Sequence, residues 1–200
     1  MGGLIIPARR GFLLKTGQTT VYVAGDNGTN PVGLAKAYQV LTTGQYAGNT
    51  NITINSKTDA HPNACVLDLN TGLMWSRKES ASVGPASDGK IPWTTTGSGA
   101  TAEGIWPYVA AANAAQLAGY SDWRIPNMFE LVSLMDLEVA NGLPDGTVFP
   151  GWNANWTPWT ATTTPNDVTK VMTPWFLNGG VLTALKTATN FCILVRGGNF

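Results

Sequence analysis

The stretch that decides the fold is Asp122-Trp123-Arg124-Ile125-Pro126-Asn127, which runs directly into Met128-Phe129-Glu130-Leu131-Val132-Ser133-Leu134-Met135. Asn127 can cap a helix that starts at Met128, because its side chain can accept from the backbone N–H of Glu130 while the Glu130 carboxylate reaches back to the Asn127 N–H. Pro126 fixes the approach of the chain to this helix. The pattern predicts a rigid corner, followed by a helix from Asn127 to about Leu137.

The corner carries Trp123 and Arg124 side by side. An indole beside a guanidinium suits either a hydrogen-bonded core corner or a platform for a ligand. A single pair of this kind is more often buried in a core. The corner is therefore evidence about the fold rather than about the function.

Four further motifs flank the corner in a fixed order. Asp68 to Trp75 reads Asp-Leu-Asn-Thr-Gly-Leu-Met-Trp, which predicts a hairpin with its turn from Asp68 to Gly72 and a returning strand from Leu73 to Trp75. Apolar residues recur at helical spacing between Trp106 and Leu117, and Gly119 is expected to end that helix. The other two motifs are Trp159-Thr160-Ala161-Thr162 and the stretch from Cys192 to Gly198, which contains Val-Arg-Gly-Gly.

These five motifs resemble those of a bacterial family of C-type-lectin-like domains, named after the C-terminal domain of a collagen-like adhesin. The resemblance runs from about Ala64 to the end of the chain. It implies an α+β, C-type-lectin-like fold in which two helices pack on a twisted, mainly antiparallel sheet. It also implies structural roles for the motif residues Trp75, Trp123, Arg124, Trp159 and Arg196.

The resemblance further implies that the strand starting near Cys65 pairs side by side with the last strand, Phe191 to Val195. A disulfide between Cys65 and Cys192 is then conceivable. Adjacent buried thiols are the alternative, and a chain that folds in a reducing cytoplasm favours them.

Other strands are expected from Trp159 to Thr163, from Val168 to Phe176 and from Gly180 to Lys186, the last two joined by a turn at Asn178-Gly179. Residues 79–101 are rich in Gly, Ser, Thr and Pro and are expected to form a loop.

Composition limits the class of protein. The chain has 200 residues, of which 12% are charged, and its formal net charge is zero. This length allows one ordinary domain with an appendage. The chain lacks the basic field of a nucleic-acid binder, and no apolar run is long enough for a membrane span. Few charges with many Gly, Thr and Asn suit a turn-rich β protein whose surface is partly covered by partners.

Residues 1–62 differ from residues 63–200, which we assign to the C-type-lectin-like domain. The N-terminal segment contains strand-like pieces at Thr19 to Ala24 and Asn51 to Asn55, and it contains no tryptophan. It is interpreted as an extended, β-rich arm that docks on other subunits, with a homo-oligomer expected and a trimer favoured. The apolar residues expected to make this contact are Leu4, Ile5, Ile6, Phe12, Leu13 and Leu14.

The start of the chain does not have the pattern of a secretory signal, because its apolar stretch is short and the pair Arg9-Arg10 follows it. We therefore expect folding in a host cytoplasm and a final location in a virion. The alternative is an extracellular or bacterial-surface location, within a longer exported protein.

Residues for chemistry are sparse. His61 is the only histidine, so a multi-histidine metal site is not expected. Asp136 and Glu138 would lie two residues apart on a helix and would face different ways. Asp26 to Asn30 lacks the far acidic residue of a calcium loop. We expect no catalytic residue, no metal, no cofactor and no enzymatic activity.

The densest aromatic and amide cluster runs from Gly151 to Trp159, within a long irregular stretch from Asn141 to Pro158. Indole faces can stack on sugar rings and amides can bond hydroxyls, so the candidate ligand residues are Trp152, Asn153, Asn155 and Trp156. The alternative is that the tryptophans fill the core beneath the loop or an inter-subunit contact.

The function predicted from the sequence is that of a non-enzymatic phage virion structural protein, associated with the tail or capsid. It would display a C-type-lectin-like domain for assembly and for binding to a host surface or glycan. The alternative is a bacterial secreted or surface adhesin domain that binds polysaccharide.

Overall fold

The computed structural model describes residues 15, 18, 20–21, 23–24, 33–42, 51–54, 57–60, 65–77, 90–93, 104–142, 144–150, 152 and 155–197. Within them lie the helices α1 (Ile105–Ala114) and α2 (Met128–Val132) and the 3-10 helix η2 (Ala140–Gly142). The strands are β1 (Tyr38–Leu41), β2 (Asn51–Ile54), β3 (Lys57–Ala60), β4 (Cys65–Asp68), β5 (Leu73–Ser76), β6 (Lys90–Pro92), β7 (Thr163–Thr164), β8 (Asp167–Trp175), β9 (Gly180–Leu185), β10 (Thr189–Phe191) and β11 (Val195–Gly197). Helices and antiparallel sheets together confirm the α+β class.

The main sheet has the order β1-β4-β5-β11, and every neighbouring pair in it is antiparallel. Its centre is the predicted β4–β5 hairpin. The Asp68 carboxylate accepts from the backbone N–H groups of Asn70 (2.9 Å) and Thr71 (3.3 Å), and Gly72 takes a φ of 70° that suits glycine. The prediction of a hairpin at this motif is confirmed.

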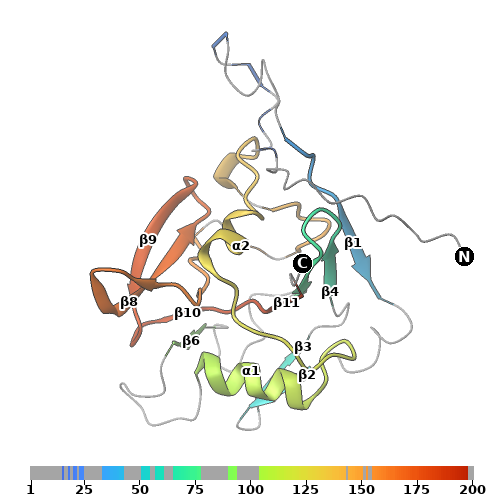
Figure 1. The fold of residues 1–200 in the computed structure, drawn as a ribbon, viewed down its shortest axis with the longest axis vertical. Coiled ribbons are helices and arrows are strands. Elements are labelled where there is room, and N and C mark those ends of the chain that lie inside the picture. The colour runs from blue at the N-terminus through green and yellow to red at the C-terminus, as the bar shows by residue number, and fades with distance from the viewer. Residues whose placement is uncertain are drawn as a thin grey trace, which may run out of the picture.

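Two hydrophobic clusters cover the two faces of this sheet. Side chains alternate between the faces of a strand, so Cys65 and Met74 belong to one cluster while Val66 and Trp75 belong to the other. The first cluster includes residues of α1, and the second includes Leu131 of α2. The two helices therefore lie on opposite faces of the main sheet, well apart in Figure 1.

The predicted pairing of the two cysteine strands is wrong. β11 pairs with β5, and β5 separates it from β4, which starts at Cys65. The returning strand of the hairpin occupies one side of β4, and β1 occupies the other. Cys65 and Cys192 are both buried in the same core cluster and are not joined in a disulfide. Burial raises the pKa of the Cys65 thiol to about 12.

The remaining strands form three smaller sheets, with the orders β7-β8-β9, β10-β6 and β2-β3. β8 and β9 confirm two of the predicted strands. The strand expected from Trp159 is limited to β7, and the one expected from Phe191 to Val195 is divided between β10 and β11. β6 lies within residues 79–101, so that part of the expected loop is a strand, because it pairs with β10 from far along the chain.

The capping box at α2 is confirmed. The Asn127 side chain accepts from the Glu130 N–H at 3.0 Å, and the Glu130 carboxylate accepts from the Asn127 N–H at 2.7 Å. The helix ends at Val132 rather than near Leu137. The next two backbone bonds, from Leu134 N–H to Leu131 and from Met135 N–H to Val132, are of the tighter three-residue kind.

Described parts of the N-terminal segment join the domain. β1 pairs with β4, and Leu41 and Ile52 belong to the same core cluster as Ile105 of α1. Residues 20, 21, 23 and 24 are not in a strand, so the expectation of a strand from Thr19 to Ala24 is wrong for them. The six apolar residues expected to dock on other subunits lie outside the described residues. No described helix is long and apolar enough to span a membrane.

Candidate functional site

The Trp123 side chain is buried in the core and is fixed there by hydrogen bonds. It is 2% exposed, and its indole N–H donates to the carbonyl of Leu117 at 2.8 Å. The Asn113 amide, on α1, holds the Trp123 backbone from both sides, accepting from its N–H at 2.7 Å and donating to its carbonyl at 2.9 Å. With its indole enclosed in this way, Trp123 does not form a platform for a ligand.

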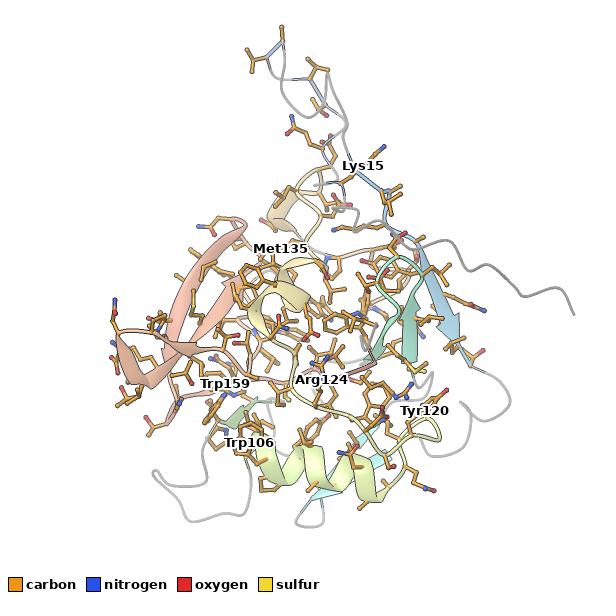
Figure 2. All side chains as sticks on the ribbon, in the orientation of Figure 1. Lys15, Trp106, Tyr120, Arg124, Met135 and Trp159 are labelled. Atoms are coloured by element: carbon orange, nitrogen blue, oxygen red, sulfur yellow. The ribbon has the colours of Figure 1, made fainter. Side chains whose placement is uncertain are left out.

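Arg124 joins the corner to the end of the domain (Figure 2). Its guanidinium donates to both carboxylate oxygens of Glu130, at 2.8 and 2.7 Å, and to the Gly197 carbonyl at 3.2 Å. Its backbone exchanges two 2.9 Å hydrogen bonds with Val195. These bonds fix the last strand against the helix cap.

Arg196 has a similar role. It donates to both oxygens of the Asp122 carboxylate, at 2.5 and 3.0 Å, and its guanidinium carbon lies 3.5 Å from the centre of the Tyr120 ring. Hydrogen bonding to Arg196 lowers the pKa of Asp122 below its ordinary value.

Trp75 and Trp159 are both fully buried. The Trp159 indole donates to the Ile91 carbonyl at 2.6 Å and so links this region to β6 (Figure 2). The buried Trp75 indole nitrogen has no hydrogen-bond partner among the described residues.

The tryptophans of the candidate ligand loop pack against aromatic neighbours. Trp152 is half-buried and meets Phe176 edge to face, with ring centres 4.6 Å apart. Trp156 is 7% exposed and stacks on Phe191 at 3.9 Å between ring centres. Asn155 is exposed, and Asn153 lies outside the described residues. The indoles therefore fill the core beneath the loop, and Asn155 remains at the surface.

A pocket of about 310 Å³ lies at this loop. Asn155, Trp156 and Thr157 line one side, and the β6–β10 pair contributes Lys90, Asn190 and Phe191. The Thr157 hydroxyl donates to the Asn190 side-chain oxygen at 3.0 Å, and the Lys90 ammonium lies 5.5 Å from the centre of the Phe191 ring. The stacked rings form an apolar wall, and the other four residues supply a hydroxyl, two amides and a cation.

The pocket includes two predicted ligand residues, Asn155 and Trp156, and not Trp152. Lys90, Thr157, Asn190 and Phe191 were not predicted. The β6–β10 pairing that brings three of them together is long-range, and β6 was expected to be loop. The only local signal was the aromatic and amide density of the neighbouring loop.

The residues considered for chemistry do not gather at this pocket. Because α2 ends early, Asp136 and Glu138 lie in the turns that follow it, where Asp136 accepts from the Glu138 N–H at 3.1 Å. Within the described part of the chain, no three His, Cys, Asp or Glu residues lie close enough to hold a metal ion. His61 and the segment Asp26 to Asn30 lie outside it.

The described chain is an α+β domain. Its last strand, β11, forms one edge of the main sheet and is held by two arginine–carboxylate pairs. The sequence model of the Lcl C-terminal domain family matches residues 64–196, and the chain belongs to this family. The resemblance drawn from the five motifs is thereby confirmed. No curated protein and no solved structure matches the chain.

Proposed function

We propose that the chain is a non-enzymatic binding domain of C-type-lectin-like fold, whose pocket at Lys90, Asn155 and Trp156 binds a sugar of a surface glycan. The observation that carries this proposal is the composition of the pocket wall. Trp156 and Phe191 are only 7% and 8% exposed, so the edge of their stack forms the apolar floor of the pocket, and the amides, hydroxyl and ammonium around it supply the contacts to sugar hydroxyl groups.

The described residues that line the pocket supply one ionisable group, the Lys90 ammonium, beside two amides and a hydroxyl. These groups can hold the hydroxyl groups of a sugar by hydrogen bonds. The stacked rings are held by their neighbours before any ligand arrives, which limits the ordering cost of binding. Because Trp156 is largely covered by Phe191, specificity falls mainly to the polar residues around the stack.

A glycan array tests this proposal directly. The full chain should bind a defined subset of glycans, and Asn155→Ala and Lys90→Ala should each weaken that binding roughly tenfold, the loss of one good polar contact. Asn166→Ala and Lys170→Ala are matched controls on the β7–β8 turn and on β8, away from the pocket, and should bind as the parent does. A parent protein that binds no glycan, or pocket variants that bind as well as the controls, would refute the proposal.

For the location of the domain, we propose display on a phage virion as a homo-oligomer, with the part of residues 1–62 that precedes β1 contacting other virion subunits. The observation that favours it is exposed apolar surface on the described part of this segment, where Val21 is 55% and Val23 is 66% exposed. Such side chains are commonly covered in an assembly. Thr20 bonds to Glu138, so this surface is held close to the domain.

A bacterial surface or secreted adhesin domain is the alternative location, and family membership favours it. Sedimentation of the full chain separates the two. A fall in the mass of the particle on Val21→Lys and Val23→Lys supports assembly through the segment, whereas a mass and a glycan binding that these two substitutions leave unchanged support the adhesin.

A further inference from the structure

The strand β9 forms one edge of the β7-β8-β9 sheet. β8 pairs with one side of β9, from Lys170 opposite Leu185 to Trp175 opposite Gly180. No described strand pairs with the other side of β9. In Figure 1 the β8–β9 ribbon lies at the side of the molecule away from β1 and β4.

The backbone of β9 presents hydrogen-bonding groups to its open side. Met172 donates its N–H to Thr162 and accepts from the Thr160 hydroxyl, so the Met172 backbone faces β7. Backbone direction alternates along an antiparallel ladder, so Val171 and Thr173 face β9, opposite Ala184 and Leu182. The N–H and C=O groups of the intervening β9 residues, Val181, Thr183 and Leu185, therefore point outward.

This edge lacks the features that usually protect an edge strand. From Gly180 to Leu185 it has no charged residue, no proline and no shift of register. Val181 is 50%, Leu182 is 40% and Leu185 is 49% exposed. An unpaired, uncharged and apolar edge is a surface that pairs with another extended strand.

We propose that the occupant is β9 of a second copy of this chain, paired antiparallel about a twofold axis at Thr183. A twofold axis perpendicular to the sheet keeps side chains on the same face, so Thr183 lies opposite its own counterpart. Leu182 then lies opposite Ala184 of the second copy, and Val181 lies opposite Leu185. The result is one continuous sheet that runs through both copies.

The side chains of β9 complement one another in this register. On the face directed to the core, the large Leu182 meets the small Ala184, and on the other face Val181 and Leu185 form an apolar pair. The two Thr183 residues sit as a Thr–Thr pair, another favourable cross-strand combination. The residues that exchange hydrogen bonds across the interface are the three whose backbone groups point outward, Val181, Thr183 and Leu185, so this register is compatible with the hydrogen-bond pattern.

Charge does not oppose a second copy. The nearest charged residue, Lys186, follows the strand and lies opposite Gly180 of the other copy. The two Lys186 residues are then about 20 Å apart along the paired strands and repel little. Lys186 also contacts Trp93, 4.2 Å from its ring centre, which directs its ammonium to its own subunit.

Sedimentation of the full chain from roughly 1 to 100 µM tests this contact, a range that spans weak to moderate self-association. The parent should associate, and Val181→Lys and Thr183→Pro should each halve the mass of the particle. Thr183→Pro removes an N–H that points away from β8, so the pairing within the subunit is kept. Val168→Lys is the control, since Val168 is 74% exposed on β8 and outside the β9 edge. Circular dichroism confirms that each variant is folded.

A cross-link provides a second, independent readout. Thr183→Cys should form a covalent dimer under mild oxidation, because hydrogen-bonded partners across an antiparallel pair have Cα atoms about 5.5 Å apart, within disulfide reach. Val168→Cys should not. A parent that stays unassociated at every concentration, β9 variants with the mass of the parent, or a Thr183→Cys protein that does not cross-link would each overturn the proposal. None of these results depends on glycan binding.

Discussion

Replacement of Glu130 by glutamine tests how the corner is held. In the parent, the Glu130 carboxylate accepts two hydrogen bonds from Arg124 and one from the Asn127 N–H, and its side chain is 14% exposed. Glutamine has the same shape and can still accept from Asn127, but its amide presents N–H groups to a guanidinium that has only donors. The substitution therefore removes the ion pair and keeps the cap.

The magnitude follows from the geometry. A hydrogen bond to a charged group contributes about 1.5 to 3 kcal/mol, and exposed ion pairs contribute much less. The Arg124 side chain is 42% exposed and solvent screens it in part, so we expect a loss of about 1 to 2 kcal/mol in the free energy of unfolding. For a chain of this length, that corresponds to a fall in Tm of roughly 2 to 8 °C.

Urea and thermal unfolding of the Glu130→Gln protein measure this loss. Glu138→Gln is a matched control: it makes the same chemical change at a carboxylate whose hydrogen bonds to Thr20 are exposed, and it should change stability by less than about 0.5 kcal/mol. If Glu130→Gln is no more destabilising than Glu138→Gln, the Arg124–Glu130 pair does not hold the corner.

Three other predictions concern the same framework. Trp123→Ala should lower the free energy of unfolding by roughly 3 to 5 kcal/mol, measured in urea, because it empties a site that is 2% exposed; an unchanged transition would move the indole out of the core. Because the folded protein has a lowered pKa at Asp122, the pair with Arg196 stabilises the fold fully above pH 3.8, the ordinary pKa, and less as the pH falls through the folded-state pKa. The Asp122→Asn protein should therefore have a lower free energy of unfolding than the parent at pH 7, and the difference should vanish in acid. Deletion of residues 1–62 should lower Tm markedly, because it removes β1 and the buried Ile52; an unchanged melt would contradict the placement of β1 in the core sheet.

Local patterns predicted local structure well. The cap of α2 depends on residues three apart, and the β4–β5 hairpin depends on Asp68 and the turn that follows it, so both could be predicted from a few neighbouring residues. The α+β class and the family followed from motifs in a fixed order.

Long-range pairing set the limit of prediction. β1 and β6 are short strands that pair with β4 and β10, strands distant in the sequence, so no local signal marks them. β1 pairs with the β4 side of the hairpin, so the side left for β11 is that of β5. The same kind of contact brings Lys90 and Asn190 to the candidate pocket, and for that reason only its loop residues could be predicted.

The position of β11 also determines when the domain can form. Ser76 and Leu194, which bond to each other at the edge of the main sheet, are 118 residues apart. The ribosome must therefore synthesise almost the whole domain before β11 can pair with β5. Until then, the β5 side of the hairpin has no strand partner. A chain whose synthesis stops before Val195 lacks the strand that Arg124 binds. Stable folding is thus restricted to chains that have been translated through the final motif.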